Sequence, residues 1–144
     1  MEKDVRTLKA LADENRLRLL LLLKQRELFV CQLMAIIGIS QPLVSRSLAL
    51  LDREGLLESR RSGKQVFYRL KRDLPPLAAV VLAALPAGEG CFARDRRSLQ
   101  LFCRKFQRGS SACDMAMVRK FIDFKKIKQQ QGAAHGKTGQ KRVY

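Results

Sequence analysis

The residues best suited to specific chemistry lie on one predicted helix between positions 40 and 55. Gln41, Ser45 and Arg46 combine short polar donors with a guanidinium, and helical spacing puts them on one side of that helix. The other side carries an apolar stripe made of Val44, Leu48 and Leu51. A helix that offers such donors near its N-terminus suits the major groove of DNA, where base edges present hydrogen-bond partners.

A second group of cations follows at a predicted tight turn. Two short runs flank Ser62-Gly63, and the alternation of residues from Lys64 to Leu70 indicates a β-hairpin. Arg60, Arg61 and Lys64 put three positive charges around its turn. Such a turn suits DNA phosphates or a minor groove.

The elements before these residues must position them. An apolar stripe predicts a first helix over residues 3–12, and Asp13 is suited to cap a second helix that runs to about Gln25. A third helix is predicted over Val30–Ile37, ended by Gly38, and Ser40 is suited to cap the fourth. Helix, short turn, helix and basic hairpin is the order of a winged helix-turn-helix. The alternative, a solvated helix followed by an edge ribbon, does not account for this order.

Two further helices and a basic extension are predicted after the hairpin. The apolar run Leu77–Leu85 and the stripe in Ser98–Phe106 indicate the helices. We expect a domain over residues 1–107 and a partly disordered extension over residues 108–144, which holds 9 basic and 2 acidic residues. Within the extension, residues 118–126 predict a short basic helix, either an additional arm on the DNA backbone or part of a solvated tail.

The charge of the whole chain points to an acidic partner. The 144 residues have a formal net charge of +16, and 47% of them are hydrophobic, so a basic protein with a folded core is expected. A sequence-tolerant architectural or RNA-associated protein would carry the same charge and would bind all duplexes similarly. The pattern of the predicted recognition helix favours sequence-specific binding of double-stranded DNA.

Three segments, in order, resemble the ArsR/SmtB family of winged helix-turn-helix repressors. Residues 8–18 resemble the family's opening signature and read LKALADENRLR. Residues 40–56 resemble its recognition helix and read SQPLVSRSLALLDREGL. Residues 60–70 resemble its wing and read RRSGKQVFYRL. The resemblance implies a mainly α fold with one two-stranded hairpin wing, in a cytoplasmic repressor that dimerises through its N- and C-terminal helices and releases operator DNA when an effector binds.

The resemblance and the residue pattern together assign the DNA contacts. The family's usual His in the recognition helix is Ser47 here. The expected DNA-contacting residues are Gln41, Pro42, Ser45, Arg46 and Ser47 of the helix, with Arg60, Arg61 and Lys64 of the hairpin.

The effector is expected to involve cysteines. The family's metalloid box aligns with residues 27–34, where only Cys31 is a cysteine, so this box cannot form a three-sulfur site by itself. Cys91, Cys103 and Cys113 remain, and soft thiolates favour As(III), Sb(III) or other thiophilic ions. No cofactor is required in this interpretation. An organic effector, or no effector at all, is the alternative, with these cysteines reduced and unliganded.

The sequence contains no pattern typical of an enzyme or of a membrane protein. The only His is His135, no Ser or Cys has a His near it in the sequence, and no phosphate-binding glycine loop is present. The longest apolar stretch, Leu77–Leu85, is nine residues long, whereas a membrane span needs about 20. Met1–Lys9 does not resemble a secretory signal. We therefore expect a cytoplasmic, non-enzymatic protein without a membrane partner.

Overall fold

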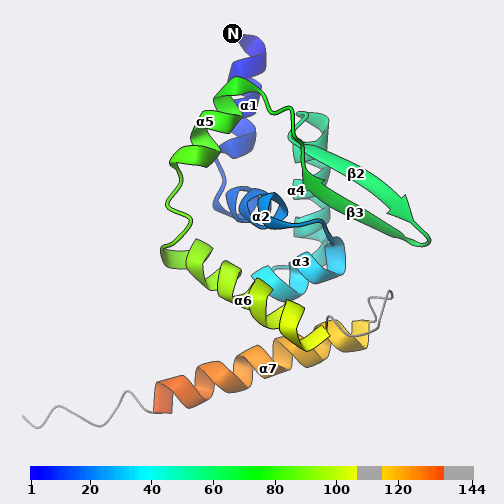
Figure 1. Cartoon of the computed structure of the whole chain (residues 1–144), viewed down its shortest axis with the longest axis vertical. Coiled ribbons are helices and arrows are strands. Elements are labelled where there is room, and N and C mark those ends of the chain that lie inside the picture. Colours follow the sequence, from blue (N-terminus) through cyan, green and yellow to red (C-terminus); the bar gives the residue numbers. More distant parts are fainter. Residues whose placement is uncertain (107–114, 135–144) are drawn as a thin grey trace, which may run out of the picture.

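The computed structural model describes residues 1–106 and 115–134, which form helices and one small sheet (Figure 1). The elements in chain order are α1 (Glu2–Leu11), α2 (Glu14–Gln25), β1 (Leu28–Phe29), α3 (Val30–Ile37), α4 (Gln41–Arg53), β2 (Leu57–Ser62), β3 (Gln65–Leu70), α5 (Pro76–Ala84), α6 (Gly90–Phe106) and α7 (Met115–Ala134). The mainly α fold predicted from the sequence is confirmed.

Helix α2 lies at the centre of the molecule (Figure 1). Its five consecutive leucines, Leu19–Leu23, are all buried, and side chains from α1, α3, α4, α6 and β3 surround it. The helix begins where predicted, because the Asp13 carboxylate accepts a hydrogen bond of 2.9 Å from the backbone N–H of Arg16.

Helices α3 and α4 form the helix-turn-helix, and the chain bends by 117° between them. Gly38 ends α3 with a φ of 80°, a left-handed conformation that glycine adopts without steric cost. Ser40 occupies the N-cap position of α4, but its side chain makes no capping hydrogen bond. No helix of the described ranges is by itself long and apolar enough to cross a membrane; α3 and α4 pass that test only as a bent pair.

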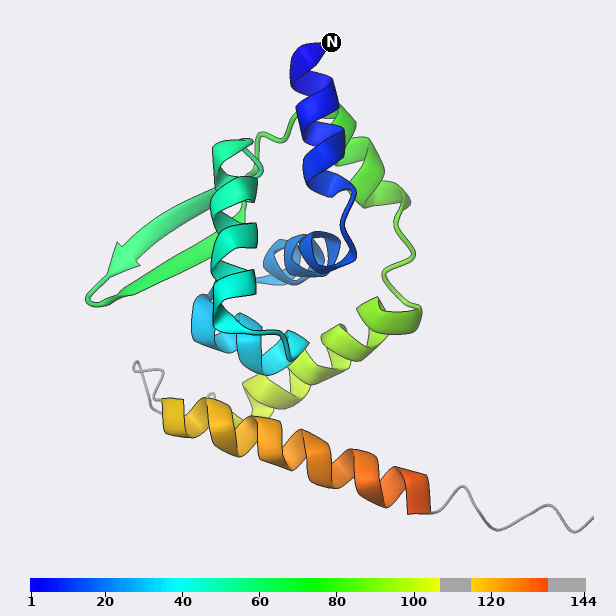
Figure 2. The same ribbon diagram turned by 180° about the vertical axis from the view of Figure 1, so that it is seen from behind.

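The predicted hairpin is present, and a third strand joins it. Strands β2 and β3 pair antiparallel from Leu57 opposite Leu70 to Ser62 opposite Gln65. The two-residue strand β1 pairs with the other edge of β3, which gives the sheet order β1-β3-β2. The sequence prediction of a two-stranded sheet was therefore incomplete, because two residues are too few to show an alternating pattern. The hairpin projects away from the helices in both views (Figures 1 and 2).

Helix α6 begins eight residues earlier than predicted. It starts at Gly90, so the stretch before Ser98 is helical as well. Phe92, Asp95, Leu99 and Phe102 lie at helical spacing and all pack inward. Since Asp95 interrupts this apolar stripe, periodicity alone did not reveal the first turns of the helix.

Helix α7 packs on the domain, so residue 107 is not the edge of the core. Val118 and Phe121 are fully buried, and the rings of Phe121 and Phe102 meet edge to face with centroids 5.2 Å apart. Helix α7 lies across α3 and α6 (Figure 2). It runs to Ala134, so the residues from Gln129 to that point are helical and do not form the predicted mobile tail. Residues 107–114 and 135–144 lie outside the described part of the chain.

This packing gives a stability prediction. Phe121→Ala should lower the free energy of unfolding by about 3–5 kcal/mol, because it removes a buried ring and leaves a cavity. Ile127→Ala is the matched control, since Ile127 lies on the same helix and is 53% exposed. Urea unfolding followed by circular dichroism measures both; equal stability of the two variants would contradict the assignment of α7 to the core.

Candidate nucleic-acid interface

One side of α4 is free of the core and carries the predicted polar residues. Val44, Leu48 and Leu51 are fully buried and fix the rotation of the helix. That rotation exposes a face made of Gln41, Pro42, Ser45, Arg46 and Ala49. Because most of these residues fall in the first two turns, the polar face is concentrated at the N-terminal end of α4, as major-groove recognition requires.

Arg46 and Ser47 differ in what they offer to a ligand. The Arg46 Nε donates to the carbonyl oxygen of Pro42 at 3.3 Å, which directs the exposed guanidinium back over the first turn. Its two terminal nitrogens make no hydrogen bond to any described residue. Ser47 is only 7% exposed, and it lies on the inner side of α4 with the apolar stripe. Ser47 was named among the expected DNA contacts, but the structure turns its side chain away from the exposed face.

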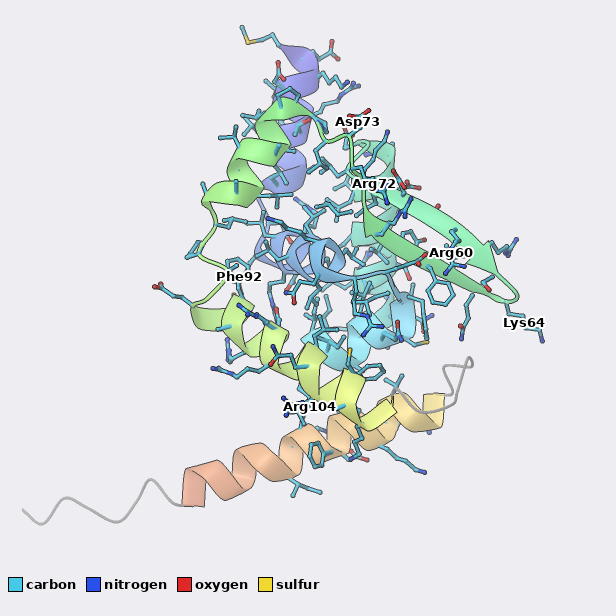
Figure 3. All side chains as sticks on the ribbon, in the orientation of Figure 1. Arg60, Lys64, Arg72, Asp73, Phe92 and Arg104 are labelled. Atoms are coloured by element: carbon cyan, nitrogen blue, oxygen red, sulfur yellow. The ribbon has the colours of Figure 1, made fainter. Side chains whose placement is uncertain are left out.

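The hairpin tip presents two unpaired cations. Ser62 pairs with Gln65, so Gly63 and Lys64 form the turn, and Gly63 has a φ of 61°. Arg61 and Lys64 are exposed and make no ion pair within the described ranges. Figure 3 shows Lys64 at the outer end of the hairpin. These two cations are available to a phosphate backbone.

Arg60, the third predicted cation of the hairpin, is already paired. Its Nε and one terminal nitrogen donate to the two Glu27 carboxylate oxygens at 2.7 and 3.1 Å, and its guanidinium lies 4.8 Å from the Phe67 ring centroid. The hydrogen bonds from Arg60 hold the pKa of Glu27 below its ordinary value. At neutral pH this pair connects the wing to the residue before β1, and it reduces the charge that Arg60 offers to DNA.

The two described cysteines of the proposed C-terminal effector site are not brought together within one chain. Cys91 and Cys103 both lie on α6, 12 residues apart, which corresponds to about 18 Å along the helix axis. The glycines at 88 and 90 precede Cys91, so they do not fold the two cysteines toward each other. Cys31 lies on α3, and Cys113 falls outside the described residues. Within the described ranges no three His, Cys, Asp or Glu side chains form a group that could hold a metal ion.

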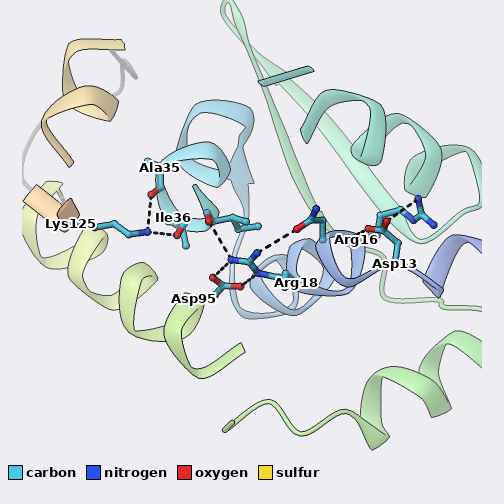
Figure 4. A network of polar contacts seen from close by, with 9 residues as sticks. Asp13, Arg16, Arg18, Ala35, Ile36, Asp95 and Lys125 are labelled. Atoms are coloured by element: carbon cyan, nitrogen blue, oxygen red, sulfur yellow. Dashed lines mark hydrogen bonds and ion pairs between the residues drawn. The ribbon is translucent and has the colours of Figure 1, made fainter. Parts of the chain in front are cut away.

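A buried ion pair lies behind the helix-turn-helix, and no sequence pattern predicts it. The Arg18 guanidinium makes two hydrogen bonds of 2.7 and 2.8 Å to the Asp95 carboxylate, with side-chain exposures of 15% and 6% (Figure 4). The hydrogen bond that Arg18 donates to Asp95 raises the pKa of Arg18, although burial acts in the opposite direction. The same guanidinium donates to the carbonyl oxygen of Ile37 at 3.2 Å.

Lys125 of α7 adds a second cation at the same end of α3. Its Nζ donates to the carbonyl oxygens of Ile36 at 2.6 Å and Ala35 at 3.3 Å (Figure 4). Burial lowers the pKa of this lysine. Residue 125 was predicted on a basic helix, but as a possible DNA-backbone contact. The structure assigns it to the last carbonyls of α3, where a cation also interacts favourably with the helix dipole.

Comparisons with known proteins agree with this geometry. Residues 13–59 match the family model "Bacterial regulatory protein, arsR family". The "Arsenical resistance operon repressor" of Escherichia coli K12 is 47% identical over 79 residues, covering 54% of this chain and 68% of the relative. The "Arsenic resistance transcriptional regulator ArsR2" of Pseudomonas putida KT2440 is 48% identical over 68 residues, covering 46% of this chain and 59% of the relative.

A solved structure shares the fold. The transcriptional repressor BigR from Xylella fastidiosa has a TM-score of 0.50 and 40% sequence identity, over 56% of this chain and 80% of that one. This fold and these relatives are those of DNA-binding transcriptional regulators, which are not enzymes. The chain, with its recognition helix and basic wing, belongs to the ArsR family of bacterial regulatory proteins.

Proposed function

We propose that this protein is a transcriptional repressor that binds operator DNA sequence-specifically and is released from it by an effector. The observation that carries the proposal is the exposed polar face of α4, which presents Gln41, Ser45 and Arg46, together with the exposed cations of the wing. Helix α4 would lie in the major groove, and Arg61 and Lys64 would contact the backbone or the adjacent minor groove. Repression is supported by the names of the relatives, and release by an effector is what the resemblance to the ArsR/SmtB family implies.

The geometry argues against a sequence-tolerant architectural protein. Such a protein needs a broad field of free cations, whereas two arginines of the wing are engaged by glutamates. Glu27 holds Arg60, and Glu58 holds Arg69 at 2.6 Å. The wing cations that remain unpaired within the described ranges, Arg61 and Lys64, accompany exposed side chains of α4 that are able to read bases, which favours specific readout over binding by charge alone.

A homodimer in the cytoplasm is part of the proposal. Val5 and Leu8 of α1 and Val80 of α5 are exposed apolar side chains, and α1 and α5 pack side by side (Figure 1). Pairing of these two helices with a second copy would cover them. Two recognition helices would then face half-sites about 34–36 Å apart on a palindromic operator.

The best candidate for the effector is a thiophilic metalloid, As(III) or Sb(III), bound by thiolates. The arsenic-resistance names of two relatives and the soft chemistry of thiolates support this choice. Since Cys91 and Cys103 lie far apart on one helix, the site needs Cys113 or a cysteine of the second copy, with Cys31 as a weaker candidate. No bound cofactor is required for folding in this proposal.

The proposed function is tested by selection from a random duplex library with the full chain. A palindromic sequence should be enriched, and competition with random duplex should show that it binds about 10³-fold more tightly or better at physiological salt. Random duplex that competes as well as the selected site would mean an architectural protein.

The roles of helix and wing predict different variant behaviour. Arg46→Ala should cost about 1–3 kcal/mol on the selected site and relax its specificity at one position, because a bidentate contact to guanine is lost. Lys64→Ala should weaken binding to all DNA sequences alike, because one phosphate contact is lost. The slope of the logarithm of the binding constant against the logarithm of the salt concentration should fall by about one unit. Fluorescence anisotropy titrations over a range of salt concentrations measure both effects.

Glu27→Gln tests the wing in the opposite direction. It removes the carboxylate that holds Arg60 and should make the salt slope steeper by about one unit as that guanidinium becomes available. Parent-like binding by both Arg46→Ala and Lys64→Ala would overturn the assignment of α4 and the wing.

Metalloid sensing predicts operator release by arsenite and antimonite, compared with cadmium and zinc in the same assay. Release should be lost when Cys91, Cys103 and Cys113 are replaced together by Ser, and it should persist in Cys31→Ser. The metalloid affinity should rise with pH toward the usual thiol pKa of about 8.5, because thiolates must lose protons to bind. Release that survives the triple replacement would end the thiol proposal, and no release by any ion would favour an organic effector.

A further inference from the structure

A cavity of about 440 Å³ lies between α2, α5 and α6. Its volume falls in the range of small-molecule sites, roughly 300–1,000 Å³. Its lining combines leucines of α2 and α5 with Arg18, Lys24, Ala87, Phe92, Asp95 and Arg96. None of the residues that line the cavity is a cysteine, so a ligand bound here needs no contact with a thiol.

The walls combine an apolar surface with unpaired positive charge. Leucines of α2 and α5 and the ring of Phe92, at the start of α6 (Figure 3), supply the apolar part. Lys24 and Arg96 are exposed and make no ion pair within the described ranges. The one carboxylate of the lining, Asp95, already accepts two hydrogen bonds from Arg18. The charge left for a ligand is therefore positive.

We propose that this cavity binds a small organic acid, with its carboxylate at Lys24 and Arg96 and its apolar body against the leucines and Phe92. The chemistry of the walls argues against a cation or an inorganic anion as the ligand. A cation would meet two unpaired positive charges, and an inorganic anion would leave the apolar walls in contact with water. Charge-assisted hydrogen bonds fix the acid group, and burial of the apolar body adds affinity.

Arg18 connects the cavity to the recognition helix. Its guanidinium binds Asp95 in the cavity wall and the carbonyl oxygen of Ile37, the last residue of α3 (Figure 4). Gly38 follows directly, and α4 begins three residues later. A bound acid adds a negative charge beside this ion pair, so it changes how strongly the Arg18 guanidinium is held at the carbonyl oxygen of Ile37. Its effect on the operator rests on the proposed function, whereas its binding does not.

The binding test uses calorimetry on the full chain without DNA. The probes are benzoate, phenylacetate, hexanoate and octanoate, each compared with its own primary amide, which keeps the shape and removes the charge. At least one acid should bind, and its amide should bind about tenfold more weakly or worse, because a charge-assisted hydrogen bond is lost. No binding by any acid up to its solubility limit would overturn the proposal.

Variants locate the site. The double replacement Lys24→Gln and Arg96→Gln should lower the affinity for the acid by about tenfold or more. Arg97→Gln is the matched control, since Arg97 is an exposed neighbour on α6 outside the lining. Ala87→Phe should abolish binding by filling the cavity. Equal effects of Arg97→Gln and Arg96→Gln, or unchanged affinity in Ala87→Phe, would overturn the site. So would sedimentation that shows Ala87→Phe as a monomer where the parent is a dimer, because the cavity would then be an interface.

The DNA measurement separates the two proposals. The bound acid should change the affinity for the selected duplex by roughly 5–150-fold, and the duplex should change the affinity for the acid by the same factor. Acid binding with no preference among duplexes would refute the repressor and leave the site standing. Acid binding with unchanged operator affinity would refute the connection through Arg18. A specific operator without acid binding would refute the site alone.

Discussion

Helix α2 carries five consecutive leucines, so apolar side chains leave it in every direction and each of them must be covered. Burial of each leucine contributes about 1.5–3 kcal/mol, so the arrangement that encloses the whole helix is strongly favoured. The enclosing elements are α1, α3, α4, α6 and β3. The positions of the recognition helix and of the wing both follow from this requirement, because α4 and β3 are parts of the enclosure.

The end of α3 shows how polar groups refine this arrangement. The carbonyl oxygens of Ala35, Ile36 and Ile37 have no partner inside the helix, and cations from two other helices satisfy them. Arg18 brings its own counter-ion, Asp95, so its charge is balanced where water is largely excluded. The turn into the recognition helix is thereby tied to α2, α6 and α7 together.

The DNA-facing surface depends on which charges are free rather than on how many are present. Eight basic residues lie between positions 46 and 72, but the glutamates at 27 and 58 engage two of the arginines. These exposed pairs add little stability, because water and salt screen them. Their larger effect is on binding, because they withdraw Arg60 and Arg69 from the positive charge that the wing offers and leave Arg61 and Lys64, near its tip, unpaired within the described ranges.

The sequence by itself determined the elements that have local signals. Helical periodicity, the Asp13 cap and Gly38 located the first four helices, and alternation around Ser62-Gly63 located the wing. The exposed face of α4 could be predicted in the same way, since one apolar stripe fixes the rotation of a helix. Ser47 was the exception, because it lies at the border of that stripe.

Only the tertiary structure decided what depends on contacts between distant residues. Asp95 interrupts an apolar stripe and is stable there only because Arg18, 77 residues earlier, neutralises it. The pairing of Arg60 with Glu27 and the third strand of the sheet likewise have no local signature. Sequence periodicity shows which face of its own helix or strand a residue occupies. Which residue of another element neutralises a buried charge, or shares a site with a cysteine, is set by how the elements pack around α2.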